Sequence, residues 1–171
     1  MAWRVLIITV SDKGSRGERA DTSGPLAEEI MIRAGYESAG LEILPDEKEL
    51  LKDRLRAVCD QNLADLILTS GGTGLSQRDV TPEATIEVSE KLVPGLPEAM
   101  RAASLKITSR AMLSRAAAGV RGRTLIINLP GSPKGVRENL EVILPALDHG
   151  LGILTGQESD CAQPERPGKP G

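Results

Sequence analysis

Residues 65–85 read DLILTSGGTGLSQRDVTPEAT, and this stretch indicates the fold class of the whole chain. The apolar and β-branched run at residues 65–70 is typical of a strand that is buried on both faces, as in a parallel sheet. Three glycines follow at once. Thr81-Pro82-Glu83 then has the form of a helix start, with threonine as the cap and proline in the first turn. A strand, a glycine loop and a helix in this order are typical of an α/β protein.

Strand and helix patterns alternate along the rest of the chain. Strand patterns also occur at residues 5–10, 36–44 and 123–129, and helical patterns begin near residues 23, 46, 81, 97, 111 and 136. Ser23 is expected to cap the first of these helices. The alternation predicts a single three-layer α/β/α domain with a mostly parallel sheet over residues 1–156. Residues 157–171 are rich in proline, glycine and charge, and are expected to form a flexible polar tail.

Composition argues against several classes of partner. The chain has 171 residues, a formal charge of −3, one Trp, one Tyr and no Phe. Without a basic stripe or an aromatic stacking platform, no nucleic-acid partner is expected. Basic residues gather locally at Arg101, Lys106, Arg110, Arg115, Arg121 and Arg123, where we expect mostly solvated faces, with one or two near an anionic substrate.

Cysteine usage and hydropathy point to the cytoplasm. Cys59 and Cys161 form neither a disulfide framework nor a CxxC metal site. Such a chain suits a reducing compartment. No signal peptide and no membrane-spanning run is recognised, so no membrane association is expected. His149 is the only histidine, and it is given a structural role near a helix end.

The glycines after the strand at residues 65–70 suggest a phosphate site. In open α/β sheets, ligands bind beyond the carboxyl ends of the strands, where Gly71, Gly72 and Gly74 lie. Their N–H groups can approach a phosphate closely, and Thr73 adds a hydroxyl. The stretch matches neither a Walker A loop nor GxGxxG. From the glycines alone, a phosphate nest and a plain tight turn are therefore equally good interpretations.

Two aspartates favour the phosphate nest. Asp79 follows the glycines, and a carboxylate is repelled by phosphate unless a divalent cation such as Mg²⁺ lies between them. Asp46 ends another strand and is expected at the same edge of the sheet. The two are therefore predicted to share a metal–nucleotide site. The alternative role is helix capping, which is strongest for Asp46 because residues 46–49 have capping-box spacing.

A second loop, NLPGSPK at residues 128–134, also follows a strand and opens a helix. Its backbone N–H groups and the Ser132 hydroxyl are suited to an anion at the helix N-terminus. Two such loops on one edge predict two phosphorylated ligands or one extended ligand.

Residues 69–85 resemble the corresponding segment of the molybdopterin adenylyltransferases, which include the bacterial MogA proteins and the G domains of gephyrin and the plant Cnx proteins. Four other segments are similar to family blocks in the same order: TVSDKGSRGERADTSGP (9–25), ILPDE (43–47), PGLPEAMR (94–101) and INLPGSPKGV (127–136). Several spaced motifs in the right order are more specific than one glycine loop. The likeness extends over nearly the whole chain.

The resemblance implies a reaction and a set of partners. Family members bind Mg-ATP and molybdopterin, and the terminal phosphate of molybdopterin attacks the α-phosphate of ATP. Adenylylated molybdopterin forms and pyrophosphate leaves. The product passes to a separate molybdate-inserting protein, and members are typically homotrimers with a three-layer α/β fold. These properties are expectations for the present chain.

The resemblance also implies site residues. Asp46 and Asp79 match the family's two important aspartates, with Asp79 expected to hold Mg²⁺ and Asp46 to support the same metal or the nucleotide. The remaining expected substrate-binding residues are Ser11 and Asp12 on the nucleotide side, Gly71, Gly72, Thr73 and Gly74 around the phosphates, and Asn128, Pro130, Gly131 and Ser132 for the pterin or its phosphate.

Three alternatives remain open from the sequence. A MoaB-type relative would bind molybdopterin with little or no adenylylation, although the run at residues 78–83 resembles the active group more closely. A scaffold module, as the gephyrin domain partly is, is disfavoured because no second domain is expected. A generic nucleotide-binding domain that acts on another phosphorylated substrate is compatible with the composition.

Overall fold

The structure is a computed structural model that describes residues 2–157. One six-stranded sheet has the order β2-β1-β3-β6-β5-β4. Its strands are β1 (Arg4–Val10), β2 (Glu37–Leu44), β3 (Leu66–Ser70), β4 (Lys91–Leu92), β5 (Ala118–Arg121) and β6 (Thr124–Leu129). The helices are α1 (Asp12–Ser15), α2 (Ser23–Arg33), α3 (Lys48–Asp60), α4 (Thr81–Val88), α5 (Gly95–Leu105), α6 (Pro133–Thr155) and the 3₁₀ helix η1 (Ser109–Leu113).

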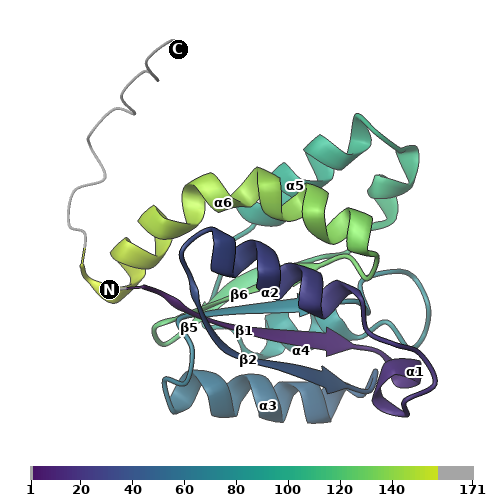
Figure 1. The fold of residues 1–171 in the computed structure, drawn as a ribbon, viewed down its shortest axis with the longest axis horizontal. Coiled ribbons are helices and arrows are strands. Elements are labelled where there is room, and N and C mark those ends of the chain that lie inside the picture. Colours follow the sequence, from purple (N-terminus) through teal and green to yellow (C-terminus); the bar gives the residue numbers. More distant parts are fainter. Residues whose placement is uncertain (1, 158–171) are drawn as a thin grey trace.

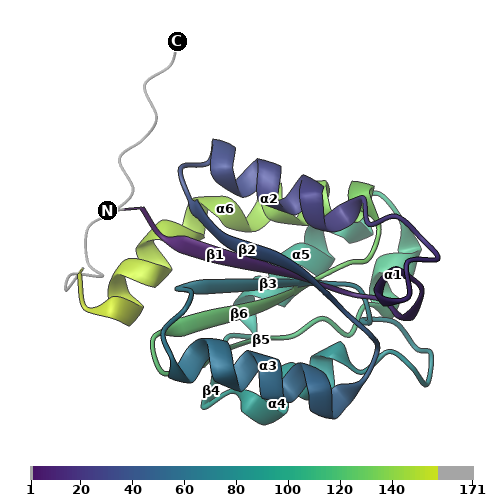
Figure 2. The same cartoon turned by 60° about the horizontal axis from the view of Figure 1, so that its bottom comes forward.

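Helices cover both faces of the sheet, as the sequence predicts. Helices α2, α5 and α6 lie on one face, and α3 and α4 lie on the other (Figures 1 and 2). Strands β1, β2, β3 and β6 are parallel, whereas β4 and β5 pair antiparallel to their neighbours. All four predicted strands are present, and the three-layer, mostly parallel α/β architecture is confirmed.

The core consists of two apolar layers, one on each side of the sheet. Successive side chains of a strand point to opposite faces. Accordingly, Val5 and Ile7 of β1 pack in the layer beside α2, α5 and α6, while Leu6 and Ile8 pack in the layer beside α3 and α4. All four side chains are buried. Each such burial stabilises the fold by about 1.5–3 kcal/mol, which explains why β1 is a continuous apolar run.

Two predicted helix caps are wrong. Helix α3 begins at Lys48 with Glu47 as its N-cap, and no side chain caps it, so residues 46–49 form no capping box. The Asp46 carboxylate is instead engaged by the Asp12 N–H, 2.8 Å away. Thr81 is the first residue of α4 rather than its cap, although proline does lie in the first turn.

The predicted cap of α2 is also wrong. Ser23 is the first residue of this helix. Asp21 takes the capping role, since its Oδ1 accepts hydrogen bonds from the N–H groups of Ser23 and Gly24 at 3.1 and 3.0 Å. The sequence alone does not identify this cap, because Asp21 and Ser23 are both residue types that are common at the N-cap position.

The parallel strands end together at one edge of the sheet. The segments that leave this edge are residues 11–22 after β1, 45–47 after β2, 71–80 after β3 and 130–132 after β6. Helix α1 lies beside it (Figure 1). All predicted site residues fall on these segments or at the ends of their strands. The predicted polar tail lies almost wholly outside the described residues.

Among residues 2–157, no helix has the length and apolar character needed to cross a membrane.

Candidate active site

An acidic cavity of about 570 Å³ opens at the carboxyl edge of the sheet. We call it the acidic cavity because Asp21, Asp46 and Asp79 line it, together with Ser11, Arg19, Ser70, Gly71, Gly72, Gly131 and Ser132. The two aspartates that the sequence predicts to share a site therefore line one cavity. They come from different loops, after β2 and after β3, and only the parallel topology brings them together.

The glycines after β3 lie directly beside these carboxylates. A Cβ atom on Gly72 would lie 2.3 Å from Thr81 Oγ1 and 3.2 Å from Asp46 Oδ1. One on Gly74 would lie 2.9 Å from Asp79 Oδ2. Gly72 also has a φ of +66°, in the left-handed region. The tight turn is therefore real, and the same turn places the backbone against both carboxylates.

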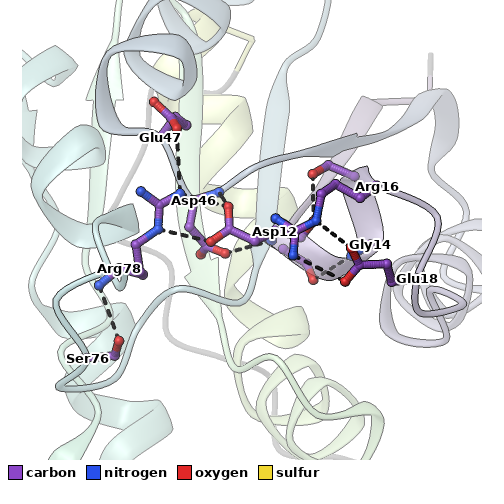
Figure 3. Close-up of polar contacts among 10 residues, drawn as sticks. Asp12, Gly14, Arg16, Glu18, Asp46, Glu47, Ser76 and Arg78 are labelled. Carbon is purple, nitrogen blue, oxygen red and sulfur yellow. Dashed lines mark hydrogen bonds and ion pairs between the residues drawn. The ribbon is translucent and has the colours of Figure 1, made fainter.

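Asp12 holds Asp46 in place. Asp12 N–H donates to Asp46 Oδ2 at 2.8 Å, and Asp46 N–H donates to Asp12 Oδ1 at 3.0 Å. Arg78 donates from Nε and Nη2 to the two Asp12 carboxylate oxygens at 2.9 and 2.8 Å, and Figure 3 shows these side chains converging. Arg78 and the Asp46 N–H already occupy the Asp12 carboxylate, so Asp12 supports Asp46 and is not among the residues that line the cavity.

The surroundings of Asp46 disfavour the ionised form of its carboxyl group. Burial raises the pKa of Asp46, and the negative charges of Asp12 and Asp79 raise it further, while the Asp12 N–H and Arg78 oppose the shift. In contrast, Arg78 lowers the pKa of Asp12. A cation next to Asp46 would relieve both the burial penalty and the repulsion between carboxylates.

The donor set fits a divalent cation that arrives with its substrate. Within residues 2–157, no group of three or more His, Cys, Asp or Glu side chains is arranged to hold a metal by itself. Asp46 and Asp79 provide hard oxygen ligands from one cavity. Mg²⁺ is commonly bound by one or two carboxylates plus substrate phosphates and water, and this pair matches that pattern.

A second cavity of about 600 Å³ adjoins the acidic one. We call it the cationic cavity because its lining has three basic side chains, Arg101, Arg110 and Lys134, and one carboxylate, Glu138, which lies 3.7 Å from Lys134. Apolar side chains that include Met100, Ile107, Leu113 and Pro130 complete the lining. Ser132 lines both cavities. The loops between them touch, since a Cβ on Gly131 would lie 3.3 Å from Gly71 Cα. The mixed lining suits an organic ligand that carries negative charge.

The predicted substrate-binding residues divide between the two cavities. Gly71 and Gly72 line the acidic cavity, and Thr73 and Gly74 line the cationic one. Pro130 lines the cationic cavity and Gly131 the acidic cavity, with Ser132 at both. Ser11 lines the acidic cavity, and its Oγ also accepts the Gly14 N–H at 3.0 Å.

Asn128 does not reach either cavity with its side chain. The residue is fully buried, and its Nδ2 donates to Thr69 Oγ1 at 2.9 Å and Thr85 Oγ1 at 2.8 Å. Its Oδ1 accepts from Ala117 N–H at 3.1 Å. The structure therefore does not favour the predicted substrate contact of Asn128, because its amide is used to join β6 to its neighbours.

Arg115 is the main residue that sequence reasoning missed. Its Nε donates to the Gly74 carbonyl and its Nη2 to the Asp79 carbonyl, both at 2.7 Å. Nothing local in the sequence distinguishes it from the other basic residues noted there, since Arg110 also precedes a buried alanine, Ala111, just as Arg115 precedes Ala116. Arg101 and Arg110, from the same group, line the cationic cavity.

Cys59 takes no part in the site. The thiol is buried in the layer beside α3 and α4, and burial raises its pKa to about 11. It is therefore a thiol, not a nucleophilic thiolate, near neutral pH.

Known proteins match the chain over most of its length. Residues 6–149 match the family described as a probable molybdopterin binding domain. The molybdopterin adenylyltransferase of Helicobacter pylori strain J99 is 41% identical over 152 residues, covering 88% of this chain and 86% of that protein. That of Escherichia coli K12 is 39% identical, covering 84% and 74%. Gephyrin of Dictyostelium discoideum is 40% identical over 91% of this chain but only 23% of its own length.

Solved structures share the fold. The molybdopterin biosynthesis enzyme MoaB of Thermus thermophilus has a TM-score of 0.85 and 55% identity, covering 90% of this chain and 97% of that one. A MogA structure has a TM-score of 0.84 and 38% identity, covering 88% and 99%. The chain therefore belongs to the MogA/MoaB family of molybdopterin-binding domains.

Proposed function

We propose that this chain is a molybdopterin adenylyltransferase of molybdenum cofactor biosynthesis, which transfers AMP from Mg-ATP to the terminal phosphate of molybdopterin. The observation that carries the proposal is the pairing of Asp46 and Asp79 in one cavity, beside a second cavity of opposite charge. Relatives about 40% identical over most of the chain are named for this activity.

The two cavities divide the substrates between them. The triphosphate of ATP lies in the acidic cavity along Gly71 and Gly72, and molybdopterin lies in the cationic cavity with its phosphate near Ser132 and Lys134. An oxygen of that phosphate attacks the α-phosphorus of ATP. The bond from this phosphorus to the bridging β-oxygen breaks, and pyrophosphate leaves. Both reacting groups thus meet where the two loops touch.

The protein contributes position and charge to this reaction, without a covalent step. Asp46 and Asp79 are the residues that would hold Mg²⁺ with the bound ATP, and the ion would offset the negative charge of the polyphosphate. The glycine N–H groups and Lys134 stabilise charge on the other phosphate oxygens. Asp12 and Arg78 keep Asp46 oriented. A nucleophilic side chain is not needed because the substrate phosphate is the nucleophile.

A pyrophosphate-release assay tests the proposal. Purified protein with Mg-ATP and molybdopterin should release pyrophosphate and form one equivalent of adenylylated molybdopterin. Omitting either Mg²⁺ or molybdopterin should abolish release. Tight binding of molybdopterin with no release above background would contradict the proposal.

That contrary outcome would support a second candidate, a MoaB-type protein that binds molybdopterin with little or no adenylylation. The 55% identity with a protein described as MoaB favours it. The paired carboxylates favour transfer over binding alone, because a site that only binds an anionic pterin has no need of two negative charges.

The same proposal extends to assembly and location. A homotrimer in the cytoplasm, which hands its product to a separate molybdate-inserting protein, is the arrangement we propose. Large apolar side chains are well exposed at Leu75, Leu92, Ile107, Met112 and Leu113, and an oligomer would cover some of them. Native mass spectrometry should give three times the chain mass, and a monomeric mass would contradict this part.

A further inference from the structure

Arg115 forms hydrogen bonds to both ends of the loop that carries Asp79. The Arg115 N–H donates to the Thr73 carbonyl at 3.0 Å. Its guanidinium donates to the carbonyls of Gly74 and Asp79, both at 2.7 Å, and also pairs with Glu83 Oε1. One residue therefore binds three carbonyls that bracket the loop at residues 73–79.

The rest of that loop faces outward. Residues 75–78 are exposed, and Leu75 retains 66% of its accessible surface. Asp79 Oδ2 accepts the Ser76 N–H at 2.9 Å, which is a contact within the same turn and does not tie the loop to the rest of the domain. Such a loop has few apolar contacts to fix its position, so polar contacts hold it: the Arg78 side chain donates to Asp12, and the loop backbone accepts hydrogen bonds from Arg115.

We propose that Arg115 is a positioning residue for the adenylyl transfer, which fixes the carboxylate of Asp79 relative to Asp46 by holding the loop backbone. This inference rests on the proposed function. Arg115 lines neither cavity and acts only through the loop. Its planar guanidinium presents several donors in a fixed geometry, and a lysine ammonium cannot bridge two carbonyls and a carboxylate in the same way.

Arg121 provides a matched control. It lies at the end of β5 away from the site and makes the same kinds of contact, to the Asp60 carboxylate at 2.8 and 3.0 Å and to the Val88 carbonyl at 3.2 Å. If Arg115 only links segments of the fold, its substitution should affect turnover no more than substitution of Arg121. If it positions Asp79, its substitution should lower turnover and that of Arg121 should not.

The kinetic test compares Arg115→Lys with Arg121→Lys. For Arg115→Lys we expect kcat to fall roughly 100-fold, because a small displacement of a catalytic group has effects of this size. The KM for Mg-ATP should change by less than about threefold, since the loss belongs to the transition state. Arg121→Lys should keep both constants. A kcat for Arg115→Lys within about threefold of the wild type would overturn the proposal.

A double variant, Arg115→Met with Glu83→Gln, tests whether an unpaired, half-buried Glu83 carboxylate causes the defect. It removes the guanidinium and its carboxylate partner together, and its kcat should match that of Arg115→Lys or fall further. A kcat restored to the wild-type value would show that only the unpaired Glu83 had caused the defect, which would also overturn the proposal.

Amide hydrogen exchange on the protein without substrates separates this inference from the proposed function. Exchange in residues 73–80 should be faster in Arg115→Lys than in the wild type and unchanged in Arg121→Lys. Equal exchange in all three proteins would refute the positioning role even if the enzyme is active. If the wild type lacks adenylylation but exchange in residues 73–80 is still faster in Arg115→Lys, the proposed function is wrong, whereas the role of Arg115 in holding the loop is confirmed.

Discussion

The acidic and cationic cavities lie side by side, yet they present opposite charge to their ligands. The acidic cavity presents the carboxylates of Asp46 and Asp79, where we propose that a polyphosphate binds, whereas the cationic cavity offers Arg101, Arg110 and Lys134. An anion can enter the second directly, but it enters the first favourably only with a cation. This difference in charge would allow one edge of the sheet to bind two anionic substrates at separate positions.

The largest effect should come from Asp79→Asn. Asparagine keeps the shape and the acceptor for the Ser76 N–H, so the turn should survive while the charge is lost. We expect kcat to fall by about 10²–10³-fold, the usual cost of removing one preorganised electrostatic group. Steady-state pyrophosphate release measures it. Asp53→Asn on the exposed surface of α3 is the control, and normal turnover by Asp79→Asn would disprove the metal assignment.

Asp46→Asn should also abolish most turnover, but with a distinctive effect on stability. Burial raises the pKa of Asp46 in the folded protein above its unfolded value of about 3.9. As pH rises through the window between these two pKa values, the free energy of unfolding of the wild type should therefore fall relative to that of the variant. Below this window the carboxyl is protonated in both states and the contribution vanishes. Denaturant unfolding at neutral and acidic pH tests this, and lower stability with normal turnover would instead indicate a structural residue.

In the cationic cavity, Arg110→Gln should raise the KM for molybdopterin and leave the KM for Mg-ATP alone. Loss of one charge-assisted hydrogen bond to the substrate predicts an increase of about tenfold. Arg33→Gln, on the exposed face of α2, is the control. An equal rise in both KM values would show that the two cavities do not divide the substrates as proposed.

The smallest effect is expected from Arg78→Gln. Arg78 opposes the rise in the pKa of Asp46, so its loss should move the acid limb of kcat/KM for Mg-ATP to higher pH. Turnover at neutral pH should fall by less than about tenfold, because Arg78 donates its hydrogen bonds to Asp12 and acts on Asp46 only indirectly. The pH profile of the variant provides the check, and a limb displaced to lower pH would contradict the assigned cause.

The sequence was sufficient for those features that depend on short patterns. Continuous apolar runs identify β1, β3 and β6, and two aspartates that follow parallel strands must share an edge. Strand β4 has only two residues, so no pattern reveals it. The roles of Arg115 and Asn128 depend on partners dozens of positions away, at Gly74 and Thr69 respectively. No local pattern contains such contacts.

The close approach of Gly71 and Gly131 matters for anyone who wishes to redesign this protein. A methyl group at residue 131 would lie 3.3 Å from Gly71 Cα, so the two loops that meet between the cavities would have to move apart by a few tenths of an ångström. Substitutions intended to change the nucleotide specificity should therefore leave Gly71 and Gly131 unchanged. Arg19 and Ala20 are the better place to begin, because both residues are exposed and line the acidic cavity.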